Sequence, residues 1–137
     1  MNTEKLTELI GDLTVFDLNI DFKNKSIIMN LGYLPFDKNP IKTISFQNIV
    51  WQDFFGFDID NIQNTVEYTN DFNIFLEHKK DYIEKNLKYS PINLLNNLQN
   101  SQYHYYYSKP TLGFEFLIIT QTEIIISDLY EEQKSSN

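Results

Sequence analysis

Apolar and polar side chains alternate without an exception from Phe16 to Phe22, in the run FDLNIDF. Because successive side chains of a strand point to opposite faces of a sheet, this pattern predicts a strand with one buried and one solvated face. The segment 23–25, KNK, is typical of a turn, and the alternation resumes from Ile27 to Tyr33. The sequence therefore predicts a β-hairpin over residues 15–33.

Further stretches have the composition of strands, rich in β-branched and aromatic residues. We expect them at 41–50, leading into Trp51, and at 65–69, 72–76, 102–108, 113–119 and 123–127. The last two are separated by Thr-Gln-Thr, which predicts a tight hairpin between them. Together these segments predict a mostly antiparallel sheet of about six to eight strands, with closure into a barrel left open.

Two regions have a helical pattern instead. Leu6, Leu9, Ile10 and Leu13 follow the spacing of one helical face, with Thr3 as the expected N-cap and Gly11 as the stop, so a short helix is expected within 3–13. Ser90-Pro91 is a helix-start signal for a second helix that turns Ile92, Leu95 and Leu98 inward. Residues 78–88 fit either a helix or a loop. The fold class is therefore α+β, with a helical segment near 80–100.

The chain of 137 residues has the length of one globular domain, 1–137, whose polar end at 131–137 is expected to form a disordered tail. It contains no cysteine, which excludes disulfides, zinc ribbons and thiol nucleophiles. Its N-terminus lacks the basic region and apolar core of a signal peptide, and no window is apolar enough for a membrane helix. We therefore expect a cytoplasmic protein of bacterial type without membrane contact.

Acidic residues outnumber basic ones by 19 to 11, which gives a formal net charge of −8. All the basic residues are lysines, so the chain has no guanidinium group to bind phosphates or guanine edges in a bidentate manner. This charge pattern disfavours nucleic acid as a partner. It favours encounter with a basic protein, unless the charge serves solubility alone.

Motifs for catalysis or metal binding are absent from the sequence. His78 and His104 belong to no metal-binding pair or nucleophile arrangement, and the chain has neither a nucleophile elbow nor a glycine-rich phosphate loop. Asp58-Ile-Asp60 is similar to the start of a calcium loop, but Gln63 and Thr69 replace the glycine and the bidentate glutamate that such a loop requires. We therefore predict no catalytic residue, no cofactor and no metal site.

The segment 102–108, QYHYYYS, is the densest aromatic cluster of the chain. As a strand it would place three tyrosines on one face and His104 with Tyr106 on the other. Such tyrosines either pack in the core or remain exposed as contacts for a partner. The candidate partner-binding residues are these tyrosines and an acidic turn: Asp53, Asp58, Asp60, Tyr103, Tyr105, Tyr106 and Tyr107.

Three segments carry a resemblance to a known group of proteins. They are ISFQNIV at 44–50, followed by FFGF at 54–57 and by Asn61-Ile62, and the closing stretch from Tyr105 to Ile119. Here the chain resembles small immunity proteins of bacterial polymorphic toxin systems. The resemblance implies a cytosolic protein that neutralises a cognate toxin by stoichiometric binding, without catalysis of its own.

Two other functions remain open. A small-ligand-binding β-sheet or barrel domain would have a concave apolar pocket of several hundred Å³. A small hydrolase-type enzyme would hold two titratable groups within hydrogen-bond reach in such a cleft, at least one of them with a perturbed pKa.

Overall fold

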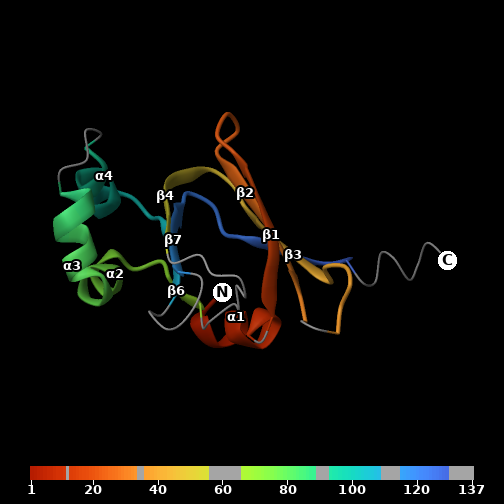
Figure 1. Cartoon of the computed structure of the whole chain (residues 1–137). Coiled ribbons are helices and arrows are strands. Elements are labelled where there is room, and N and C mark those ends of the chain that lie inside the picture. The colour runs from red at the N-terminus through yellow and green to blue at the C-terminus, as the bar shows by residue number, and fades with distance from the viewer. Residues whose placement is uncertain (12, 34–35, 56–65, 89–92, 109–114, 130–137) are drawn as a thin grey trace.

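A computed structural model describes residues 1–11, 13–33, 36–55, 66–88, 93–108 and 115–129 (Figure 1). In these ranges the chain forms eight strands, arranged as two four-stranded antiparallel sheets, together with short helices. The α+β class and its mostly antiparallel character are therefore confirmed. The predicted tail at 131–137 lies outside the described residues.

The first sheet has the strand order β1-β2-β3-β8. Its strands are β1 (Thr14–Asp21), β2 (Ser26–Gly32), β3 (Lys42–Phe46) and β8 (Ile125–Asp128). The predicted hairpin over 15–33 is confirmed as β1 and β2, but its far end projects beyond the rest of the molecule (Figure 1). Ile20 is therefore 38% exposed and Phe22 is 77% exposed, although the alternation predicted one continuously buried face.

The second sheet has the order β4-β7-β6-β5. Its strands are β4 (Ile49–Phe55), β7 (Glu115–Thr120), β6 (His104–Ser108) and β5 (Val66–Thr69). The two central strands, β6 and β7, pair with each other, and β4 and β5 form the two edges. The second sheet contains most of the predicted aromatic cluster.

The single strand predicted at 41–50 is wrong, because the chain passes from one sheet to the other in the middle of it. β3 ends at Phe46 and β4 begins at Ile49. Between them Asn48 has a φ of 54°, a left-handed conformation that asparagine tolerates better than most residues. Its carbonyl oxygen accepts a hydrogen bond from the Gln121 amide at 3.0 Å. The adjacent apolar pair at 49–50 is the point where the alternation breaks.

The hairpin predicted between 113–119 and 123–127 is also wrong. β8 pairs with β3, with Ile126 opposite Ile44, whereas β7 pairs with β4 and β6. The short segment between β7 and β8 is therefore a crossover from the second sheet to the first. A short turn sequence does not distinguish a hairpin from a change of sheet.

The strand predicted at 72–76 is wrong as well, since this segment is the helix α2 (Phe72–His78). The Asp71 carboxylate accepts a hydrogen bond from the Asn73 amide at 2.8 Å and caps the helix. An N-cap supplies a partner for an amide that the first helical turn would leave unsatisfied. Here this local signal prevails over the β propensity of phenylalanine and isoleucine.

The N-terminal helix α1 spans Thr3–Ile10 and is followed by Gly11, as predicted. Its N-cap is Asn2, not Thr3, because the Asn2 side chain accepts a hydrogen bond from the Lys5 amide at 2.8 Å. The Thr3 hydroxyl contacts β5 instead and accepts a hydrogen bond from the Tyr68 amide at 3.0 Å. This contact fastens α1 to the end of the second sheet.

The helical region predicted near 80–100 is confirmed where it is described, and in the structure it begins earlier, with α2. After α2 come α3 (Lys80–Tyr82), a π-helical segment (Ile83–Leu87) and α4 (Leu94–Asn100). The predicted start at Ser90-Pro91 lies outside the described residues. These helices cover one face of the second sheet, and the first sheet lies on the opposite side (Figure 1). None of the described helices is both long and apolar enough to cross a membrane.

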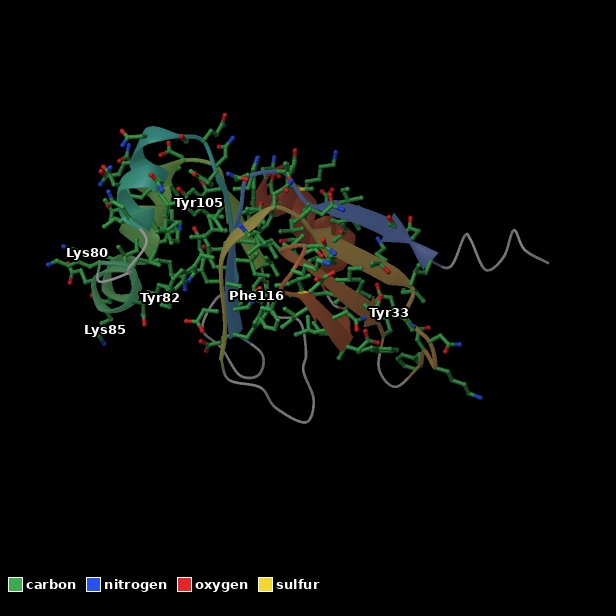
Figure 2. The ribbon with its side chains drawn as sticks, turned by 90° about the horizontal axis from the view of Figure 1, so that it is seen from above. Tyr33, Lys80, Tyr82, Lys85, Tyr105 and Phe116 are labelled. Atoms are coloured by element: carbon green, nitrogen blue, oxygen red, sulfur yellow. The ribbon has the colours of Figure 1, made fainter. Side chains whose placement is uncertain are left out.

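The second sheet is therefore buried on both faces. Between the two sheets lie the larger apolar side chains Phe46, Tyr106, Phe116 and Ile118. Between the second sheet and the helices lie Phe75, Leu98, Tyr105, Tyr107 and Ile119. Figure 2 shows Tyr105 on the helical side of the sheet and Phe116 on the side of the first sheet. The central strands thus connect two separate cores.

Two neighbouring tyrosines of β6 differ in the hydrogen bonds of their hydroxyl groups. Tyr106 is fully buried, and its oxygen accepts a hydrogen bond from the Ile124 amide at 3.0 Å. Tyr105 is 1% exposed, and among the described residues its hydroxyl has no hydrogen-bond partner. Burial without a partner costs free energy, whereas a satisfied hydroxyl contributes to stability.

We therefore expect opposite results from removing the two hydroxyls. Tyr106→Phe leaves the buried Ile124 amide unsatisfied and should lower the free energy of unfolding by about 1–3 kcal/mol. Tyr105→Phe removes an unpaired polar atom and should leave stability unchanged or raise it. Urea denaturation of both variants measures the difference. Equal losses of stability would contradict the assignment.

Candidate functional site

The tyrosines of β6 are core residues. Tyr105, Tyr106 and Tyr107 are 1%, 0% and 2% exposed, so the expectation that they offer an exposed contact surface is wrong. The physical reason is that β6 is a central strand covered on both faces, so that alternation places no tyrosine in solvent. Tyr103, which precedes β6, is half-buried and lines a pocket.

The predicted acidic turn is only partly described. Asp58 and Asp60 lie outside the described residues. Asp53 lies on β4 and is half-buried, where its carboxylate accepts a hydrogen bond from the Tyr82 hydroxyl at 2.6 Å. The structure thus places Asp53 in an internal contact between β4 and the helices.

Trp51, Tyr82 and Asp53 form a chain of hydrogen bonds. The Trp51 indole Nε1 donates to the Tyr82 hydroxyl oxygen at 3.0 Å, and that hydroxyl donates to Asp53. Burial raises the pKa of Tyr82 well above its ordinary value, and the hydrogen bond to the carboxylate raises it further. The hydroxyl therefore stays protonated and serves as a fixed donor, fastening α3 to β4.

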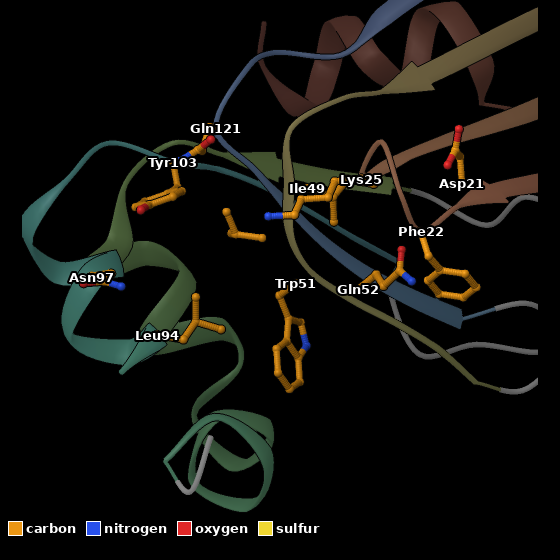
Figure 3. A pocket seen from close by; sticks show the side chains of 11 residues that line it. Asp21, Phe22, Lys25, Ile49, Trp51, Gln52, Leu94, Asn97, Tyr103 and Gln121 are labelled. Carbon is orange, nitrogen blue, oxygen red and sulfur yellow. The ribbon is translucent and has the colours of Figure 1, made fainter. Parts of the chain in front are cut away.

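A pocket of about 530 Å³ lies next to this chain of hydrogen bonds (Figure 3). We call it the edge pocket. Its lining residues come from the end of β1, the β1–β2 turn, β4, α4 and the segments beside β6 and β7: Asp21, Phe22, Lys25, Ile49, Val50, Trp51, Gln52, Leu94, Asn97, Tyr103 and Gln121. Four of them are consecutive residues of β4.

Ile49 packs into the core between the two sheets, whereas Val50 and Trp51 pack against the helical core, so a pocket lined by all three reaches both faces of the strand and follows its edge. Figure 3 shows Trp51 and Leu94 on one side of the β4 ribbon and Phe22 on the other. The edge pocket is therefore a space over the edge of β4, between the projecting β1–β2 turn and α4. Its side walls are mainly apolar and aromatic.

Two charged side chains line the edge pocket, Asp21 and Lys25, and both are exposed. Hydrogen bonds from the backbone and side chain of Asn24 lower the pKa of Asp21 below its ordinary value. A carboxylate that is held in its charged form transfers protons poorly near neutral pH. The acidic group of the edge pocket is thus suited to bind a positive charge.

Both histidines contact tyrosine hydroxyls away from the edge pocket. His78 Nδ1 lies 2.8 Å from the Tyr107 hydroxyl oxygen, and His104 Nδ1 lies 2.7 Å from that of Tyr68. Burial lowers the pKa of His104. Within the described part of the chain, no three histidine, aspartate or glutamate side chains form a group that could hold a metal ion.

The sequence analysis missed Phe22 and Leu94 as candidate site residues. The alternation places Phe22 on the buried face of the hairpin, and it does not show where the hairpin extends beyond the residues that cover it. Trp51, the single tryptophan of the chain, enters the sequence pattern only as the end of a predicted strand. A lone tryptophan beside a break in alternation was the available signal, because large aromatic residues are enriched at contact sites.

No protein-family model matches this chain, and neither do any of the curated proteins or solved structures with which it was compared. The function is therefore inferred from the geometry of the edge pocket and its surroundings.

The hydrogen bonds of Tyr82 can be tested directly. Tyr82→Phe removes the partner of both Trp51 and the Asp53 carboxylate, so we expect a loss of about 1–3 kcal/mol in the free energy of unfolding. The emission maximum of Trp51 should shift too, since its indole loses a polar partner. Tyr33→Phe, at a tyrosine that is 45% exposed, is the matched control. Identical stabilities of the two variants would refute the role given to Tyr82.

Proposed function

We propose that this protein binds another protein with one-to-one stoichiometry, as an immunity protein that neutralises a cognate bacterial toxin, and that the edge pocket is part of the contact surface. The observation that carries the proposal is Phe22, an aromatic side chain that is 77% exposed beside a pocket walled by Trp51 and Leu94. In this proposal the protein acts in the cytoplasm and catalyses no reaction.

Exposed aromatic side chains next to concave apolar surfaces are typical of protein contacts. A few aromatic anchors usually supply most of the binding free energy, and they lie next to pockets from which water is expelled. Phe22 offers a rigid apolar surface, while Trp51 and Tyr103 are half-buried and provide a partly formed receptor. The arrangement supports insertion of partner side chains between the β1–β2 turn and α4.

Charge supports a basic partner. The net charge of −8 attracts cationic proteins over several ångströms, which increases the rate of encounter at low ionic strength. The apolar contacts would then determine how long the complex lasts.

A small-ligand-binding function is the second candidate, and the volume of the edge pocket favours it. About 530 Å³ falls within the range of about 300–1,000 Å³ that is typical of ligand pockets. The two functions differ in the contribution of Phe22. Because this side chain is largely exposed at the mouth of the pocket, it would contribute more to a protein contact than to a ligand enclosed by the other walls.

The proposal predicts that a gene next to that of this protein encodes a toxin, and the product of such a gene is the partner to test. Calorimetric titration should give one-to-one binding, and Phe22→Ala should weaken it about tenfold or more, as expected for an aromatic anchor. Expression of the protein should also protect cells that produce the toxin, and Phe22→Ala should reduce that protection.

Phe36→Ala is the matched control. Phe36 is 84% exposed, but it lies between β2 and β3, at the end of the first sheet opposite the β1–β2 turn. Its substitution should leave affinity unchanged. Absence of binding to the toxin would contradict the function, whereas equal effects of the two substitutions would contradict the placement of the contact.

A further inference from the structure

We infer that the edge of β4 receives an extended, positively charged segment of the partner protein as an additional strand of the second sheet. This inference rests on the proposed function and adds the mode of contact. The edge pocket would be the place where the segment enters.

The first argument is the position of β4 in its sheet. In the described part of the chain β7 is its only paired neighbour in the second sheet. In an antiparallel ladder alternate residues direct their N–H and C=O groups toward one neighbour, so the remaining residues direct theirs to the opposite edge. Such an edge is a ready template for another extended segment. The edge pocket provides the necessary space along Ile49–Gln52.

The second argument is that neighbouring segments cover only the beginning of this edge. The Ile49 amide donates a hydrogen bond to the Lys25 carbonyl oxygen at 3.0 Å, so the β1–β2 turn covers the first residue of β4. The register between β4 and β7 shifts between Ile49 and Trp51, which indicates a bulge at Val50. Val50 and Trp51 both pack toward the helical core as a result. The edge pocket lies beside this irregularity, and its lining includes residues of the β1–β2 turn and of α4.

The third argument is the pair of side walls. Side chains of an added strand would alternate between the two faces of the second sheet. One set would meet Trp51, Leu94 and Tyr103, and the other would meet Phe22 and Gln52. Recognition by strand addition uses such a division, in which main-chain hydrogen bonds give affinity and pockets for alternate side chains give specificity.

Charge complementarity indicates a cationic segment. The chain carries a net charge of −8, and the Asp21 carboxylate in the edge pocket is held ionised by Asn24. The ammonium group of Lys25, which lines the same pocket, repels a cation. We therefore expect the bound segment to place a lysine or arginine near Asp21, and we expect Lys25 to limit its affinity.

A blocked peptide of alternating valine and lysine, about eight residues long, is a suitable probe because this is an ordinary strand length. Trp51 is the only tryptophan, so its fluorescence reports on the edge pocket without interference. Titration of the full chain should give a saturable change with a Kd below about 1 mM. Nuclear magnetic resonance of the ¹⁵N-labelled protein should place the largest amide shifts in β4.

Three control probes separate the alternatives. The same peptide with alternate backbone nitrogens methylated cannot complete the ladder and should bind at least tenfold more weakly. A valine–glutamate peptide should not bind, because its charge matches that of the protein. Indole tests for a small apolar ligand, and its binding is followed by the amide shifts because indole is itself fluorescent. Equal binding of the methylated and unmethylated peptides, or saturation by indole alone with no response to the peptide, would overturn the inference.

Charge reversal inside and outside the edge pocket provides a matched pair of variants. Lys25→Glu and Lys38→Glu change the net charge equally, but Lys38 lies between β2 and β3, at the opposite end of the first sheet. Lys25→Glu should strengthen peptide binding about two- to tenfold more than Lys38→Glu does. Circular dichroism checks that both variants fold. Equal effects of the two variants would show that only the overall charge matters and would overturn the location.

The toxin experiment tests the proposed function and the peptide experiment tests the edge contact, so either one can be refuted without the other. Peptide binding at β4 without any toxin binding would refute the proposed function and leave the strand-adding edge in place. One-to-one toxin binding that shifts no β4 amide would refute the edge contact and leave the function in place.

Discussion

The fold depends on the burial of both faces of the second sheet. β6 and β7 are central strands, and residues 105–108 and 116–120 are buried without interruption. A strand of this kind needs a cover on each side, which the first sheet supplies on one face and the helical region on the other. Two features follow from this constraint. The aromatic cluster becomes core, and β4, which among the described residues pairs only with β7, lies at the edge of the second sheet, where the edge pocket forms.

Burial also determines what the tyrosine hydroxyls do. Burial raises the pKa of Tyr107 to about 12, and its hydroxyl oxygen lies 2.8 Å from His78 Nδ1 at the rim of the helical core. Tyr106 and Tyr82 use their hydroxyls in the same way, to join separate elements. Polar groups that join elements are largely withdrawn from solvent. In the proposed function, the surface that contacts the partner consists instead of the projecting β1–β2 turn and the edge of β4.

Local patterns in the sequence predicted much of the fold but not its long-range connections. The first hairpin and the N-terminal helix follow from alternation and helical spacing, which depend only on nearby residues. The change of sheet at Asn48 and the crossover after β7 do not, since the same turn residues serve a hairpin as well as a crossover. Alternation leaves open whether the tyrosines of β6 pack in the core or face a partner. The answer depends on whether β6 is a central or an edge strand, and alternation does not encode strand order. The edge pocket was missed for the same reason, because Phe22, Trp51 and Leu94 meet only in the folded chain.

Native-state hydrogen exchange tests the central claim most directly, since each amide reports the free energy of the opening that exposes it. The account predicts that the amides of β6 and β7 that pair with neighbouring strands exchange slowest, through global unfolding. It also predicts that amides at residues 50–52 of β4 that face away from β7 exchange much faster. Exchange of the β6 and β7 amides as fast as that of the β1–β2 turn, or full protection of every amide in β4, would contradict it.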